Sequence, residues 1–367
     1  INNIQGNPQE GDIVDIYTSE GKFAATGHYQ IGSIAIRILS FNQQVIDNDF
    51  WFNRLLQAYT LRKKINLTDN PETTAYRLVH GEGDGFPGLI IDIYGSTAVI
   101  QAHSVGMYHI REQIADCLKK LYGDKLSAIY DKSETTVPFK ANLNAKDNYL
   151  FGSPTGNNVL EHRNSFHINW EEGQKTGFFL DQRENRHLLQ QYCNGASVLN
   201  MFCYTGGFSV YAMRGGANLV HSVDSSAKAI DLTRENIALN FGNDTRHEAF
   251  ATDAFEFMHN VKDEYNVIIL DPPAFAKHTK ALKNALQAYK RINTQAFTRI
   301  QKGGILFTFS CSQVVSREHF RQAVFSAAAI SGRNVRILHQ LTQPADHPIN
   351  IYHPEGEYLK GLVLYVE

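Results

Sequence analysis

The stretch Asn200-Met-Phe-Cys-Tyr-Thr-Gly-Gly-Phe208 decides the fold of this chain. An apolar run that begins at Val198 stops at the pair Gly206-Gly207, which is typical of a strand that leads into a helix. Glycine lets the backbone turn sharply and approach a ligand, and the first turn of the next helix offers unpaired N–H groups. We therefore expect a carboxylate or phosphate of a ligand to bind here.

A second apolar run covers residues 219–223 and ends at Asp224, eighteen residues after Gly206. This spacing is typical of a carboxylate at the tip of the next parallel strand that binds ribose hydroxyl groups. Each feature alone is also consistent with a structural turn or a helix cap. Together they predict a cofactor that contains a nucleoside.

Two more strand ends carry acidic residues. Residues 248–252 lead to Asp253, and Val267-Ile-Ile-Leu-Asp-Pro-Pro273 places Asp271 directly before two prolines. The prolines end the strand and stiffen the turn, so the carboxylate is held at the edge of the sheet. Nicotinamide enzymes do not require this arrangement, whereas a methyl donor that faces a base does.

Strands and helices alternate strictly in this part of the chain. Strands are predicted around Val198, Leu219, Glu248, Val267, Ile305 and Val335, and helices over residues 208–214, 227–240, 253–261, 281–300 and 317–331. Residues 358–365 are expected to return as an antiparallel edge strand. The pattern predicts an α/β fold with a doubly wound, mostly parallel sheet of seven strands, whose ligands bind at the carboxyl ends of the strands.

The preceding residues predict two smaller domains. Alternating apolar and polar residues around the turn Glu20-Gly21 predict a small β module, which begins at Ile1 rather than methionine and is expected to be N-terminally incomplete. A hairpin about Gly95-Ser96 and a helix over 110–121 follow. The glycine-rich loop 81–88 lacks the lysine of a phosphate-binding loop. The predicted domains are residues 1–66, 67–165 and 166–367.

Composition limits the function classes. The chain has 367 residues, of which 43% are hydrophobic and 20% charged, with a net charge of -2, so RNA would have to bind a local basic patch. The sequence contains no run of eighteen apolar residues, so it predicts no membrane-spanning helix. The four cysteines lack metal-binding or disulfide spacing, which predicts a reducing cytoplasm and no metal. Exposed strand edges in the β module allow a homodimer.

Cys311 ends the apolar run that starts at Gly303, and Ser310 and Ser312 flank it. A cysteine after an apolar strand is often buried and inert. Here the polar neighbours favour exposure at the same edge as Asp271. A thiolate there could add to carbon 6 of cytosine or uracil, which makes carbon 5 nucleophilic enough to accept a methyl group.

Several motifs carry a resemblance over nearly the whole chain. They are Lys175-Thr-Gly-Phe-Phe-Leu-Asp-Gln-Arg183, Phe202-Cys-Tyr-Thr-Gly-Gly-Phe208, Asp271-Pro-Pro273, Phe309-Ser-Cys-Ser312, Asp346-His-Pro348 and Pro354-Glu-Gly-Glu-Tyr-Leu-Lys-Gly361. The chain resembles bacterial ribosomal large-subunit RNA (cytosine-5) methyltransferases of the 23S rRNA methyltransferase I type. The resemblance implies a PUA-like β-barrel, a middle α+β domain and a Rossmann-like class I domain that binds S-adenosyl-L-methionine.

The resemblance also implies roles for individual residues. Cys311 would be the nucleophile, and Asp271 would bind the polar edge of the target pyrimidine. The residues implied at the cofactor are Gln182, Arg183, Tyr204, Thr205, Gly206, Gly207, Asp224, Ser225, Asp253, Ala254 and Asp271. Those implied at the substrate RNA are Pro272, Pro273, Phe275 and Lys277. The candidate basic residues for binding RNA are Lys132, Lys140, Lys175, Arg183 and Lys277.

Ala274 departs from the pattern, because many RNA cytosine-5 enzymes have a second cysteine after the prolines and many relatives of this type have a lysine. The group that releases the covalent adduct is therefore unassigned. Two alternatives stay open at this point. One is methylation of a guanine nitrogen without a covalent adduct, and the other is an RNA-binding or ribosome-assembly protein without catalysis.

Overall fold

The computed structural model describes residues 3–32, 34–138, 143–261 and 265–367. The contacts divide the chain into two compact units. Unit 1 runs to Glu161 and also takes in Ile168–Leu180 and Ala345–Gly356, and unit 2 consists of His162–His167, Asp181–Pro344 and Glu357–Glu367. The division into three domains at residues 66 and 165 stays a prediction.

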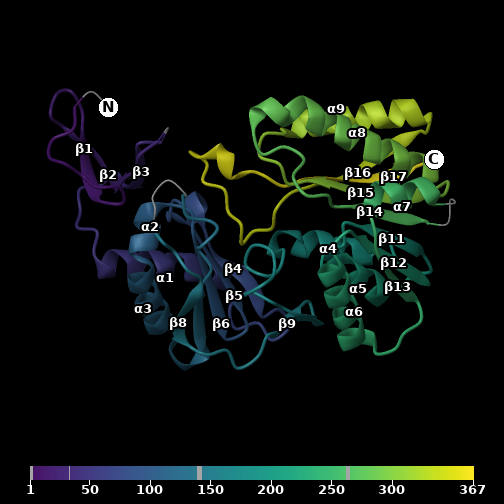
Figure 1. Cartoon of the computed structure of the whole chain (residues 1–367), viewed down its shortest axis with the longest axis horizontal. Helices are drawn as coiled ribbons and strands as arrows, with labels where there is room; N and C mark the ends of the chain where they lie inside the picture. The colour runs from purple at the N-terminus through teal and green to yellow at the C-terminus, as the bar shows by residue number, and fades with distance from the viewer. Residues whose placement is uncertain (1–2, 33, 139–142, 262–264) are drawn as a thin grey trace. The chain divides into compact units, whose positions relative to one another are not determined.

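Unit 1 begins with a three-stranded antiparallel sheet in the order β1-β2-β3. Its strands are β1 (Ile13–Tyr17), β2 (Phe23–Tyr29) and β3 (Ile36–Ser40) (Figure 1). The turn between β1 and β2 contains Glu20-Gly21, and Gly21 has a φ of 76°, a conformation that glycine adopts without strain. The hairpin expected from these two residues is therefore present.

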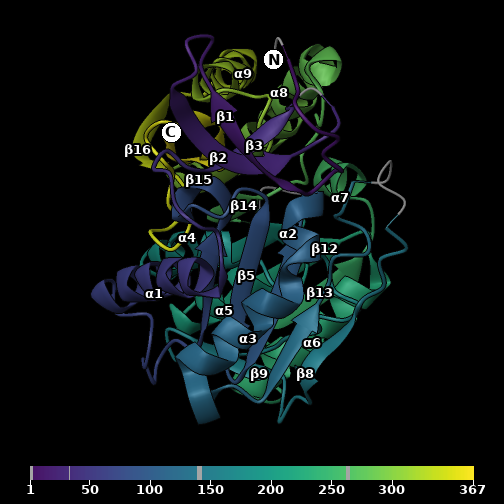
Figure 2. The same cartoon turned by 90° about the vertical axis from the view of Figure 1, so that its left-hand side faces the viewer.

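A five-stranded sheet forms the larger part of unit 1, in the order β4-β5-β6-β7-β8. Its strands are β4 (Ala75–His80), β5 (Leu89–Tyr94), β6 (Thr97–Ala102), β7 (Ala128–Asp131) and β8 (Asn148–Gly152). The helices α1 (Asn48–Lys64), α2 (Val105–His109) and α3 (Arg111–Tyr122) belong to the same unit, as does the short strand β9 (Asn158–Glu161). Helices α1 and α3 pack side by side on one face of this sheet (Figure 2).

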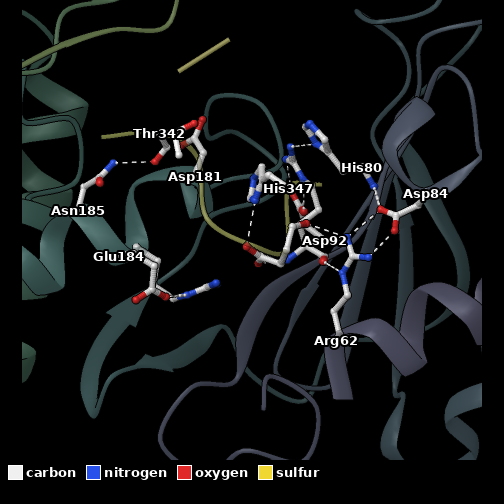
Figure 3. Close-up of polar contacts among 12 residues, drawn as sticks. Arg62, His80, Asp84, Asp92, Asp181, Glu184, Asn185, Thr342 and His347 are labelled. Atoms are coloured by element: carbon white, nitrogen blue, oxygen red, sulfur yellow. Dashed lines mark hydrogen bonds and ion pairs between the residues drawn. The ribbon is translucent and has the colours of Figure 1, made fainter. Parts of the chain in front are cut away.

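Buried ion pairs lie beside the apolar core of unit 1. Arg62, which is fully buried, forms an ion pair with Asp84 and donates to the carbonyl oxygen of Asp346 at 2.7 Å (Figure 3). Arg77 binds both carboxylate oxygens of Asp92, at 2.8 and 2.9 Å. A buried charge is tolerated when its hydrogen bonds are satisfied. The backbone N–H of Arg77 also donates to Oδ2 of Asp346 at 3.0 Å, so Arg62 and Arg77 together tie Asp346 to the rest of unit 1.

Unit 2 contains the predicted seven-stranded sheet, in the order β13-β12-β11-β14-β15-β17-β16. The strands are β11 (Ser197–Met201), β12 (Leu219–Asp224), β13 (His247–Ala251), β14 (Val267–Leu270), β15 (Gly304–Ser310), β16 (Val335–Leu341) and β17 (Lys360–Val366). The short strand β10 (Asn164–His167) also belongs to unit 2. Strands β11 to β15 are mutually parallel, and β17 is antiparallel to both of its neighbours.

Helices cover both faces of this sheet. They are α4 (Arg183–Gln190), α5 (Gly207–Arg214), α6 (Ala227–Phe241), α7 (Ala254–Asn260), α8 (Leu282–Arg299) and α9 (Arg317–Ser331). Helices α8 and α9 lie on one face, and α5 and α6 on the other (Figure 1). The doubly wound α/β architecture expected from the alternating pattern is therefore present.

The position of β17 corrects one expectation. Residues 358–365 were expected to form an edge strand, but β17 lies between β15 and β16, and β16 is the edge. Burial explains this order, because nearly every residue of β17 is buried whereas β16 exposes several of its side chains. A strand that is buried on both faces belongs inside a sheet.

Candidate active site

One edge of the seven-stranded sheet brings the predicted site residues together. Strands β12, β11, β14 and β15 are adjacent and parallel, so their carboxyl ends meet there, and the strand order reverses between β11 and β14. Because β17 is antiparallel, it contributes its first residue to this edge, with Lys360 opposite Ser310. We call this edge the site edge; it comprises residues 202–207, 224–225, 253–254, 271–275, 310–312 and 360.

The turn after β11 has a special backbone conformation. Phe202, Tyr204 and Gly206 have positive φ angles of 59°, 48° and 77°. A Cβ on Gly206 would lie 2.7 Å from Cγ2 of Thr233, so both the dihedral angle and the available space require glycine. Helix α5 follows directly, and no described side chain caps its N-terminus. Its first amides therefore suit a carboxylate.

Three side chains anchor this turn from its neighbours. The carbonyl oxygen of Tyr204 accepts from Thr233 Oγ1 at 2.9 Å, and that of Thr205 accepts from Asn236 Nδ2 at 2.9 Å. Oδ2 of Asp224 accepts from the N–H of Tyr204 at 3.0 Å. Helix α6 and the end of β12 thus hold the turn in place.

The acidic residues at the next two strand ends have defined positions. Asp224 is half-buried, and each of its carboxylate oxygens accepts one backbone N–H, which leaves a second lone pair on each for a hydroxyl group. Ser225 is exposed beside it. Asp253 caps helix α7, because its Oδ1 accepts from the N–H of Glu256 at 3.0 Å, and Ala254 is buried.

Gln182 and Arg183, which the resemblance implies at the cofactor, lie in unit 2 at the start of α4. Gln182 and Arg183 are 3% and 2% exposed. Gln182 Oε1 accepts from Asn185 Nδ2 at 2.6 Å, and Arg183 Nε donates to Glu184 at 2.9 Å. Asn185 also donates to the carbonyl oxygen of Thr342 (Figure 3). The suggestion that Arg183 grips RNA is wrong, because its side chain is buried.

Cys311 differs from the other three cysteines. It is half-buried, whereas Cys117, Cys193 and Cys203 are buried. Burial raises the pKa of Cys193 and of Cys203 to about 12, so these thiols stay protonated at neutral pH. The thiol of Cys311 lies 3.9 Å from the carbonyl oxygen of Pro272, so the end of β15 meets the turn after β14.

The residues around Asp271 form this turn. Asp271 is half-buried, Pro272 is buried and Pro273 is exposed. Phe275 is half-buried and packs on Tyr289 of α8, with ring centroids 4.8 Å apart. Lys277 is exposed and lies beyond the turn.

Lys360 is a residue of the site edge that sequence reasoning missed. It is 4% exposed, and its ammonium donates to the carbonyl oxygens of Ser312 at 2.5 Å and Tyr358 at 2.6 Å. Burial lowers the pKa of Lys360 to about 8, and the nearby side chains of Cys311 and Glu357 act in the opposite direction. The motif 354–361 pointed to this segment, but nothing in a single sequence marks a lysine as buried.

The remaining basic residues have different environments. Lys132 is 7% exposed and its ammonium donates to the carbonyl oxygens of Trp170 and Gly173, so the suggestion that it contacts RNA is wrong. Lys175 is exposed. Lys140 lies outside the described residues.

The described parts of the chain contain no group of histidine, cysteine, aspartate or glutamate side chains that could hold a metal ion. Among the same residues, no helix has both the length and the apolar character needed to cross a membrane.

Comparison with protein families gives two matches. Residues 135–349 match the family model of an S-adenosylmethionine-dependent methyltransferase, and residues 1–41 match that of a PUA-like domain.

Relatives of known name align over nearly the whole chain. The ribosomal RNA large subunit methyltransferase I of Aeromonas hydrophila is 41% identical, over 99% of this chain and 93% of the relative. The protein of the same name from Tolumonas auensis is 39% identical, with the same coverage. A solved Streptococcus mutans structure assigned to the SAM-dependent methyltransferases has a TM-score of 0.84 at 23% identity and covers 98% of this chain and 93% of that one, which shows a shared fold.

Proposed function

The chain belongs to the S-adenosylmethionine-dependent methyltransferases named ribosomal RNA large subunit methyltransferase I, and we propose that it methylates carbon 5 of a cytosine in ribosomal RNA. The membership confirms the predicted family, cofactor, fold class and class of enzyme. The names of the relatives support ribosomal RNA as the substrate. The motifs that resemble those of 23S rRNA (cytosine-5) methyltransferases support 23S RNA and cytosine as the target.

The site edge fits S-adenosylmethionine. The uncapped start of α5 suits the carboxylate of its methionine part, and Gly206 leaves room for a close backbone approach. Asp224 has lone pairs for ribose hydroxyl groups, with Ser225 beside it. We assign Tyr204 to Gly207 to the methionine part, Asp253 and Ala254 to the adenine, and Gln182, Arg183 and Asp271 to the remaining contacts. When bound, the cofactor supplies an electrophilic methyl group.

In this proposal, Cys311 makes carbon 5 of the cytosine nucleophilic enough to accept a methyl group. Carbon 5 of cytosine is too weak a nucleophile to attack a sulfonium methyl group. In the proposed mechanism the thiolate of Cys311 forms a bond to carbon 6, and the electron pair of the 5,6 double bond makes carbon 5 nucleophilic. After carbon 5 has gained the methyl group, loss of its proton and of the sulfur restores the double bond.

Asp271 orients the base in this proposal. Two prolines hold its carboxylate at the end of β14, next to the end of β15, and it accepts hydrogen bonds from the polar edge of the pyrimidine. Pro272, Pro273 and Phe275 bound the space for the base, and Lys277 binds phosphate. The base must leave its stack to reach this position.

One observation carries the proposal. Of the four cysteines, Cys311 is the one that is not buried, and it contacts the turn that carries Asp271. Methylation of a guanine nitrogen needs no covalent adduct, and in that case Cys311 has no chemical role.

Two measurements test the proposal. Methylated cytosines are mapped in ribosomal RNA from cells with and without the gene, and one site should disappear. Purified Cys311→Ser should then retain less than about one thousandth of the wild-type turnover on that RNA while it still binds S-adenosylmethionine. Cys117→Ala, a change at a buried cysteine of unit 1, is the control and should stay active. Full activity of Cys311→Ser would favour guanine methylation.

We further propose that the protein acts in the cytoplasm, where bacterial ribosomal RNA is made. The homodimer stays a prediction.

A further inference from the structure

The antiparallel insertion of β17 brings a lysine to the site edge. Lys360 pairs with Ser310 in the ladder between β15 and β17, and its ammonium reaches the carbonyl oxygen of Ser312. The side chain thus spans from the residue before Cys311 to the residue after it. No parallel strand could place its first residue at this edge, so the position depends on the direction of β17.

The bonding of this lysine is unusual for a buried charge. A buried ammonium is normally paired with a carboxylate, because removal of a charge from water is costly. The ammonium of Lys360 donates to two neutral carbonyl oxygens, and none of the described carboxylates is bonded to it. It therefore lacks a bonded counter-charge.

The groups whose charges act on the pKa of Lys360 are Cys311, Glu357 and Arg317. Asp271 and Tyr289 also face this part of the site edge, because both Cys311 and Asp271 act on the pKa of Tyr289. Glu357 and Arg317 form an ion pair with each other, so the carboxylate is already balanced. The hydroxyl group of the adjacent Tyr358 donates to Asp181 at 2.7 Å, so that carboxylate is engaged too. Asp271 lies in the turn that Cys311 contacts, but it is not among the groups that act on the pKa of Lys360. Beside the lysine, the thiol of Cys311 is the group that can supply a negative charge.

We infer that the ammonium of Lys360 is the counter-charge that holds Cys311 as a thiolate. This inference rests on the proposed function, in which Cys311 is the nucleophile, and it makes Lys360 a positioning residue that acts through the sulfur. The S–H bond breaks, its proton passes to water, and the sulfur keeps the electron pair. A nearby cation favours this form of a cysteine and so its attack on carbon 6.

The pKa of Lys360 agrees with this role. Although burial lowers that pKa to about 8, the side chain remains an ammonium at neutral pH. The thiolate is therefore favoured over the pH range in which the lysine is charged.

Alkylation of Cys311 by iodoacetamide as a function of pH tests the inference without RNA or cofactor. Only Cys311 is half-exposed, and a mass spectrum of the peptides identifies the modified residue. In Lys360→Met the rate at neutral pH should fall by about tenfold, and the profile should move to higher pH. Lys132→Met is the matched control, because Lys132 is also buried and also binds two carbonyl oxygens, but the charged groups that act on its pKa are Asp147 and Glu171 rather than a cysteine. Its profile should match the wild type.

Two outcomes would overturn the inference. One is a folded Lys360→Met protein with the wild-type pH profile. The other needs no change at Lys360: the ultraviolet absorbance of wild type minus that of Cys311→Ser should show a thiolate at neutral pH, and its absence there would refute the ion pair. Neither result depends on methylation, so the inference and the proposed function can fail separately. If Cys311 is a thiolate but the Cys311→Ser variant still methylates RNA, the proposed function is wrong and the ion pair stands.

Discussion

Replacement of Gly206 by alanine tests how the turn after β11 is built. Gly206 has a φ of 77°, and an added Cβ would lie 2.7 Å from Cγ2 of Thr233. Gly332, at the end of α9 in the same unit, is the matched control. Its φ is 68°, but an added Cβ would meet no atom within 4 Å. The two substitutions share the backbone strain and differ in the clash.

The expected losses in the free energy of unfolding follow from the backbone strain and from the clash with Thr233. Alanine in the left-handed region costs about 1–2 kcal/mol at either position. The contact with Thr233 adds overpacking of about 1–3 kcal/mol at Gly206 alone. We therefore expect Gly332→Ala to lower the free energy of unfolding by about 1–2 kcal/mol and Gly206→Ala by about 2–5 kcal/mol.

A second substitution isolates the clash. Thr233→Ser removes Cγ2 but keeps the hydroxyl group that donates to the carbonyl oxygen of Tyr204 at 2.9 Å. In the double variant Gly206→Ala/Thr233→Ser the cost should return towards that of Gly332→Ala. The coupling energy of the two changes should therefore be about 1–3 kcal/mol in the favourable direction.

The assay must report on unit 2. Both tryptophans, Trp51 and Trp170, belong to unit 1, so urea unfolding is followed by far-ultraviolet circular dichroism rather than by tryptophan fluorescence. Calorimetric titration with S-adenosylmethionine should show weaker binding by Gly206→Ala and unchanged binding by Gly332→Ala. Equal costs for the two alanine variants, or no recovery with Thr233→Ser, would refute the reasoning.

Three more predictions concern a buried lysine, a buried ion pair and a helix cap. Because the pKa of Lys360 is about 8 in the folded chain and 10.5 ordinarily, the unfolded chain holds more protons between these pH values. Stability should therefore rise by about 3 kcal/mol from pH 8 to 10.5 in wild type relative to Lys360→Met, and parallel urea curves would contradict this. Arg62→Met leaves Asp84 buried without its guanidinium and should cost about 3–5 kcal/mol in tryptophan-monitored unfolding, partly recovered by Arg62→Met/Asp84→Leu. Asp253→Ala should cost about 1 kcal/mol through the lost cap of α7, measured by circular dichroism, whereas Asp253→Asn should cost much less; equal losses would exclude capping.

The part of the site that local sequence encodes was predictable. A glycine pair after an apolar run, an acidic residue at the end of the next strand and a double proline after the fourth each impose a local geometry. The parallel sheet then brings these strand ends to one edge, as the structure shows for Gly206, Asp224 and Asp271. The alternation of strand and helix periodicity along the sequence also predicted helices α5 to α9 of unit 2.

Burial and strand order were not predictable, because both depend on tertiary packing. Lys132 and Arg183 resemble ordinary surface bases in the sequence, yet both are buried. The position of β17 inside the sheet follows from its burial on both faces, a property that its continuous apolar run 361–366 indicates only in hindsight. Lys360 was missed for the same reason, because its role depends on where β17 lies.

The order of the last two strands has a consequence during translation. β16 is synthesised before β17, yet it joins the sheet through β17. A nascent chain that has emerged only as far as β16 thus has no pairing partner for that strand. In such a chain Cys311 is already present while Lys360 is still inside the ribosome. The reactive thiol therefore acquires its cation only after the rest of the sheet has been synthesised, which delays its activation until folding is nearly complete.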